Sequence, residues 1–165
     1  MGEKNIIKYN YRDKLNQNVL KNILIENIPI LKNIKFSFVE VNKINSLLND
    51  IYNKIDFISK DTKNLLLIKD CDDVNLEISC KEIMKLKEKF YKYKDFVKWI
   101  FFIKFKGEFY AIEINIDIIF DNIDYFFEIS GFKKGYSDFL FVSEDLLYGI
   151  CIERYEYHNI LVRWV

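Results

Sequence analysis

The sequence predicts an α+β fold, in which a mostly antiparallel sheet carries N-terminal helices packed on one face, within a single domain spanning residues 1–165. Three observations favour this class. Helical periodicity dominates residues 13–58, and a β-hairpin pattern follows over residues 97–116. The last segment, residues 139–165, contains three short apolar stretches with the length of strands. Helices that precede most of the strands are typical of α+β domains.

Two amphipathic helices are predicted in the first third of the chain. The first begins at Asp13, ends before Pro29 and carries apolar residues at three- and four-residue spacing, namely Leu15, Val19, Leu20, Ile23 and Leu24. The second has an apolar stripe made of Ile44, Leu47, Leu48, Ile51 and Ile55. The residues before the first helix, 1–12, are polar and mixed, so we expect them to form a frayed start.

A third helix is predicted to begin at Ser79. Ser79 and Glu82 have the spacing of a capping box, in which each side chain bonds the backbone amide of the other residue. Residues 117–129 fit both the helical and the strand template. Helix is favoured there, because one helical stripe would be formed by Phe120, Ile123 and Phe127.

The clearest strand signal is the hairpin. Val97–Phe105 is β-branched or aromatic apart from two lysines, Lys106-Gly107 supplies the turn, and Phe109–Ile116 alternates. A short strand is predicted over residues 34–38, and the apolar run Leu65–Ile68 suits a buried strand. The C-terminal strands are expected over Phe139–Val142, Ile150–Glu153 and Ile160–Val165.

Composition limits the class of protein further. A chain of 165 residues with 50% hydrophobic residues is not intrinsically disordered, and five Gly with one Pro leave no flexible linker. Residues 1–6 lack the apolar core of a secretory signal, and the apolar stretch Trp99–Ile103 is far shorter than the roughly 20 residues of a membrane span. We therefore expect a cytoplasmic protein without a membrane partner. Reduced thiols are predicted at the three irregularly spaced cysteines, Cys71, Cys80 and Cys151.

The net charge of zero arises because segments of opposite charge cancel each other. Residues 81–106 hold nine lysines against three acids, a net charge of +6. Residues 107–165 hold four basic residues against eleven acids, a net charge of −7. Any charged partner would therefore meet one of these segments rather than an average surface.

The basic segment supports an alternative function, a nucleic-acid-binding module built on residues 81–106. Lysines interleaved with aromatic rings can bind single strands, because the rings stack on bases and the ammonium groups contact phosphates. Two features weigh against this alternative. Lysines such as Lys85 and Lys89 suit the outer face of an amphipathic helix, and a chain of zero net charge is a poor polyanion binder.

The acidic segment supports a protein partner instead. Tyrosines cluster there beside carboxylates, and tyrosine is enriched at protein interfaces because it joins a large apolar area to a polar tip. An acidic surface also steers the approach of a basic partner. The candidate partner-binding residues are Glu144, Asp145, Tyr148, Glu153, Tyr155, Glu156 and Tyr157, with Asp138 just before them.

No recognisable motif predicts an enzyme, a metal site or a cofactor. Asp121, Asp124 and Glu128 would share one helical face as an acid–base set, but no histidine or glycine-rich loop accompanies them. Cys151 and His158 would form a dyad only if their strands paired, and Cys151 lies between isoleucines in a predicted core strand. We predict no catalytic residue, although an enzyme with no recognisable motif stays a second alternative.

One C-terminal stretch resembles a known group of proteins. The residues concerned are Ser137 to Asp145, Tyr148 to Glu153, and a last strand ending in Trp164. This strand–turn–strand pattern resembles the C-terminal end of small uncharacterised bacterial proteins, some of which accompany polymorphic toxins as immunity proteins. The resemblance implies a non-enzymatic inhibitor whose acidic, aromatic face blocks a cognate toxin.

Overall fold

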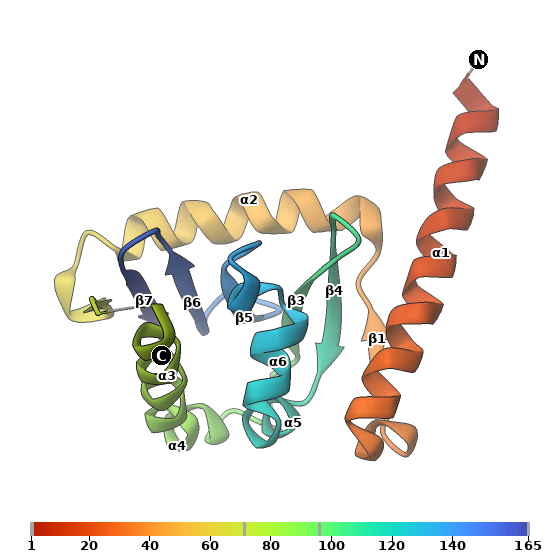
Figure 1. Cartoon of the computed structure of the whole chain (residues 1–165). Coiled ribbons are helices and arrows are strands. Elements are labelled where there is room, and N and C mark those ends of the chain that lie inside the picture. Colours follow the sequence, from red (N-terminus) through yellow and green to blue (C-terminus); the bar gives the residue numbers. More distant parts are fainter. Residues whose placement is uncertain (1, 71, 96, 165) are drawn as a thin grey trace.

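The computed structural model of the chain describes residues 2–70, 72–95 and 97–164. Within these residues one seven-stranded sheet has the order β1-β4-β3-β5-β6-β7-β2, and all neighbouring strands are antiparallel (Figure 1). The strands are β1 Ser37–Phe38, β2 Leu65–Ile68, β3 Trp99–Phe105, β4 Glu108–Ile114, β5 Phe139–Ser143, β6 Gly149–Arg154 and β7 Asn159–Trp164. The predicted single α+β domain is confirmed.

Six α-helices accompany this sheet in the described residues. They are α1 Gly2–Asn27, α2 Val41–Ile58, α3 Asp72–Lys85, α4 Lys87–Tyr91, α5 Ile116–Asp121 and α6 Ile123–Ile129. Three short 3₁₀ helices cover Pro29–Lys32, Thr62–Asn64 and Phe132–Lys134. Figure 1 shows α2 lying across the strands, while the N-terminal half of α1 extends away from the sheet.

The helices cover both faces of the sheet, which corrects the expectation that the N-terminal helices share one face. Leu20 and Leu24 of α1 join the apolar cluster that also holds residues of α3 to α6, whereas Ile51 and Ile55 of α2 join a separate cluster on the opposite face. The reason is visible in β3. Successive side chains of a strand point to opposite faces, and the first five residues of β3 are all buried. A sheet that is apolar on both sides requires cover on both sides.

The hairpin prediction is confirmed. Lys106 and Gly107 form its two-residue turn with φ values of 51° and 85°. Positive φ at both turn residues is the geometry that matches the twist of the flanking strands. Residues 117–129 are helical, with α5 and α6 meeting at Asn122, so the helical alternative for this segment is correct.

Two helix starts and the burial of one strand differ from the sequence prediction. The helix α1 begins at Gly2 rather than at Asp13. Ser79 lies inside α3 and does not cap a helix, because its buried hydroxyl donates to the Asn75 carbonyl at 2.6 Å and accepts from Asn159 Nδ2 at 3.1 Å. The strand β2 lies at the edge of the sheet, where Leu67 is 60% exposed, and so is not a buried strand.

Candidate partner-binding surface

The seven candidate residues fall into two groups at opposite ends of β6. Glu144, Asp145 and Tyr148 lie in the turn between β5 and β6. The other group consists of Glu153, at the end of β6, and three residues of the turn between β6 and β7, namely Tyr155, Glu156 and Tyr157. A strand rises about 3.3 Å per residue, so the length of β6 places roughly 20 Å between Tyr148 and Tyr155. The candidates therefore do not form one continuous surface.

In the turn between β5 and β6, the acidic residues are already engaged within the chain. Asp145 Oδ1 accepts hydrogen bonds from the Ser143 hydroxyl at 2.6 Å and from the Leu147 amide at 3.0 Å. These two bonds hold the pKa of the Asp145 carboxyl below its ordinary value. Glu144 Oε2 lies 3.7 Å from Lys98 Nζ in an ion pair. Both carboxylates thus support the local structure.

Tyr148 has a packing role as well. Its ring stacks on Tyr93 with the ring centroids 4.1 Å apart, and it lies 6.5 Å from the ring of the buried Trp99. It packs against the apolar cluster that α1 and α3 to α6 share. The Tyr148 ring therefore joins the α4–β3 connection to the β5–β6 turn. The ring face that stacks on Tyr93 is not free for a partner.

At the other end of β6, carboxylates from three elements come together. Asp138 lies immediately before β5, and its two oxygens accept from the Tyr52 hydroxyl at 2.8 Å and the Arg154 amide at 3.1 Å. Glu153 is half-buried beside it. Burial raises the pKa of the Glu153 carboxyl, and the charges of Asp138 and Asp56 raise it further. Burial and the Asp138 charge likewise hold the pKa of Tyr52 well above its usual value.

These carboxylates have no cationic partner in the part of the chain that the structure describes. The ion pairs of the described side chains, such as Lys63 with Asp61, do not include Asp56, Asp138 or Glu153. Asp56 and Tyr52 were missed by sequence reasoning. They lie four residues apart on α2, where Tyr52 packs at the border of the apolar cluster, and only the packing of α2 on the sheet brings them to Asp138 and Glu153.

The turn between β6 and β7 adds exposed aromatic rings. Tyr155 stacks on His158 with the centroids 4.7 Å apart, and the Tyr155 amide donates to the His158 carbonyl at 2.9 Å. Tyr155 remains 46% exposed and Tyr157 is 70% exposed. The acidic turn surface is the name used below for the following residues: Asp56, Asp138, Glu153, Tyr155, Glu156 and Tyr157.

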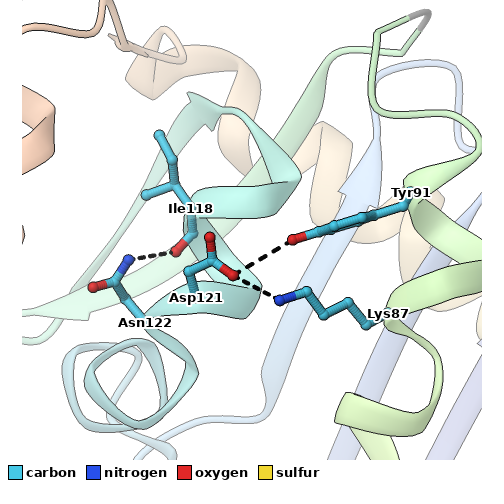
Figure 2. Close-up of polar contacts among 5 residues, drawn as sticks. All are labelled: Lys87, Tyr91, Ile118, Asp121 and Asn122. Carbon is cyan, nitrogen blue, oxygen red and sulfur yellow. Dashed lines mark hydrogen bonds and ion pairs between the residues drawn. The ribbon is translucent and has the colours of Figure 1, made fainter.

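Part of the basic segment is engaged within the chain. Lys81 and Lys85 form ion pairs with Glu77 and Glu82, each at 2.5 Å. Figure 2 shows that Lys87 and Tyr91 of α4 point toward Asp121 of α5, whose Oδ1 lies 2.7 Å from Lys87 Nζ. The largest rings of the segment, Phe90, Trp99 and Phe101, are buried in the core rather than available to bases.

The candidate catalytic groups are separated. Asp121 joins α5 to α4, whereas Asp124 Oδ1 accepts from the Cys80 thiol at 3.7 Å. Cys151 is fully buried on the face that α2 covers, where burial raises the pKa of its thiol. His158 lies in the turn against Tyr155.

The described residues lack two further features. They contain no group of three or more His, Cys, Asp or Glu side chains arranged to hold a metal ion. None of their helices combines the length and hydropathy that crossing a membrane requires.

Comparison with known proteins gives one result. No curated protein and no solved structure matches the chain. A protein-family model described as YxiF protein matches residues 67–164. This segment holds the five adjacent strands β4, β3, β5, β6 and β7 together with both turns described above. Because the match extends over more than half of the sequence, the chain belongs to the YxiF family.

Proposed function

We propose that this protein is a non-enzymatic protein-binding domain whose acidic turn surface contacts a basic partner. One observation carries the proposal: Asp56, Asp138 and Glu153 lie together without an ion pair among the described side chains. Burial raises the pKa of Glu153, and the like charges of Asp138 and Asp56 raise it further, so ionisation of Glu153 is disfavoured. A lysine or arginine supplied by a partner would relieve that repulsion on binding.

The neighbouring tyrosines suit the same role. Tyr155 and Tyr157 present partly and largely exposed rings directly beside the carboxylates. Tyrosine rings in an interface bury a large area at a low cost in side-chain entropy. Carboxylates would then steer a basic surface into place, and the rings would hold it.

We extend the proposal to an immunity-type inhibitor that occludes the working site of a cognate bacterial toxin. The resemblance of the C-terminal strands to immunity proteins supports this extension. The proposal places the inhibitor in the bacterial cytoplasm. Free thiols at Cys80 and Cys151 agree with a reducing compartment, whereas Cys71 lies outside the described residues.

The test uses the toxin domain encoded beside the gene in its source genome. Its affinity for the full chain is measured by calorimetry at low salt, for the wild type and for two charge reversals. Glu156→Lys changes the acidic turn surface, and Glu144→Lys makes the same change in the opposite turn. We expect Glu156→Lys to weaken binding by about tenfold or more, and Glu144→Lys to weaken it by less than about twofold.

Other outcomes would contradict the proposal. Equal losses in the two variants would show that the acidic turn surface has no special part in binding. A neighbourhood without a toxin gene would remove the inhibitor extension. Salt-dependent retention of an oligonucleotide by the purified protein would favour the nucleic-acid alternative instead.

A further inference from the structure

A cavity lies on the face of the sheet opposite α2. It has a volume of about 980 Å³ and opens between α1, the β3–β4 turn, α6 and the loop after α6. Its apolar lining includes Leu20, Ile23, Phe105 and Ile129. This volume is at the upper end of the range for small-molecule sites, which are typically apolar with a few placed polar groups.

The charged groups around this cavity are mostly basic. Lys104, Lys106 and Lys134 contribute to the lining, against the single carboxylate of Glu128. The ion pairs of the described side chains include none of these three lysines. The cavity therefore has an excess of positive charge that no carboxylate of the described residues neutralises by direct pairing.

The three lysines differ in the groups that their side chains contact. Lys104 Nζ lies 4.0 Å from the centroid of Phe109, a ring that packs with the α2 face, so its charge is directed away from the cavity. Lys106 Nζ lies 5.2 Å from the centroid of Phe105, which itself lines the cavity. Lys134, in the loop after α6, is exposed and also lines the cavity. Lys106 and Lys134 are thus the two cations placed to meet an anion at the mouth.

We infer that this cavity binds a small organic anion, with an aromatic or aliphatic body on the apolar floor and its acidic group between Lys106 and Lys134. The apolar lining supplies contact area, and the tyrosines Tyr125 and Tyr136 extend it toward the mouth. A charged group at the rim keeps part of its hydration, so its pairing with lysine there is not opposed by full burial. This site is independent of the proposed acidic turn surface, which uses other residues.

The test is a fluorescence titration of the full chain with 8-anilinonaphthalene-1-sulfonate, an aromatic sulfonate. We expect saturable binding that weakens as salt is added. The substitution Lys134→Glu, or Lys106→Glu, should weaken the affinity by about tenfold, because each reverses a charge at the mouth. Lys133→Glu is the matched control, since Lys133 is an exposed neighbour in the sequence that does not line the cavity. Its affinity should stay within about twofold of the wild type.

Near-ultraviolet circular dichroism of each variant shows that the probe meets a folded protein, because partly unfolded states also bind this probe. If a reversal loses the native spectrum, Lys134→Gln replaces it and should still weaken binding more than Lys133→Gln does. No binding to the wild type, or an equal effect of the Lys133 and Lys134 substitutions, would overturn the inference.

Discussion

The two ends of β6 have similar residues, but the chain engages more of them at one end than at the other. At the β5–β6 end, an aspartate closes the turn, a glutamate pairs with a lysine and a tyrosine stacks on another ring. At the β6–β7 end, Glu153 lies beside Asp138 and Asp56, and Tyr157 is largely exposed. An acidic, tyrosine-rich composition therefore does not by itself define a binding surface. What defines it is whether the chain itself satisfies those groups.

The strongest test of this comparison is Gly149→Ala at the β5–β6 end. An added Cβ would lie 2.3 Å from Trp164 Cζ2 and 2.6 Å from Cε2, closer than real contacts allow. Trp164 is nearly buried, and its indole donates to the Leu146 carbonyl at 3.2 Å, so the ring has little freedom to move. We expect a loss of about 2–3 kcal/mol in the free energy of unfolding, measured by guanidinium denaturation.

The counterpart at the other end is Tyr157→Ala. Because Tyr157 is 70% exposed, its removal should leave the denaturation midpoint unchanged. A midpoint lowered as far as that of Gly149→Ala would mean that both turns are structural, and the distinction between the two ends would fail.

A smaller effect is expected from Asp145→Ala. The variant loses the hydrogen bonds from Ser143 and Leu147, which together stabilise the turn by about 1 kcal/mol. The pKa of Asp145 is lowered in the folded protein, so its contribution is complete above the ordinary value of 3.8 and is lost as the pH falls through the folded pKa. Denaturation at pH 7 should therefore separate the variant from the wild type, and denaturation well below pH 3.8 should not. A difference independent of pH would assign the effect to packing.

A small effect with the opposite sign is expected from Glu153→Gln. The pKa of Glu153 is raised in the folded protein, so the folded state binds its proton more tightly than the unfolded state does. Ionisation then costs stability as the pH rises from the ordinary value of 4.5 through the folded pKa. The variant should be slightly more stable than the wild type at pH 7, and equal to it below pH 4.5 in thermal melts. A destabilised variant at pH 7 would show that Glu153 is satisfied within the chain.

Local signals in the sequence predicted most of the elements. The β3–β4 hairpin and the strands β5 to β7 have apolar runs bounded by turns, and each depends on neighbours in sequence. The predicted start of the helix at Ser79 was wrong. Ser79 has a capping pattern, yet it lies buried inside α3, where its hydroxyl donates to the Asn75 carbonyl of the same helix and accepts a tertiary hydrogen bond from Asn159. Periodicity also did not reveal that α1 and α2 cover opposite faces, since that choice depends on the path of the chain around the sheet.

The candidate site was predictable in part. Tyr155, Glu156 and Tyr157 follow from composition, because they are neighbours in one turn. The cluster at Glu153 was not predictable, because Asp56 reaches it only through the packing of α2 on the sheet. Nor does composition show that Asp145 and Tyr148 are engaged within the chain, since their partners Ser143 and Tyr93 are defined only by turn geometry and ring stacking.

The strand order has a consequence for protein synthesis. Both edge strands come from the N-terminal part of the chain, where Ser37 of β1 pairs with Glu113 and Leu65 of β2 pairs with Val162. During translation, the edge strands β1 and β2 therefore leave the ribosome before β4 and β7, the strands with which they pair. Leu65–Ile68 stays unpaired until β7 has emerged, so the complete sheet can assemble only after β7 has been synthesised.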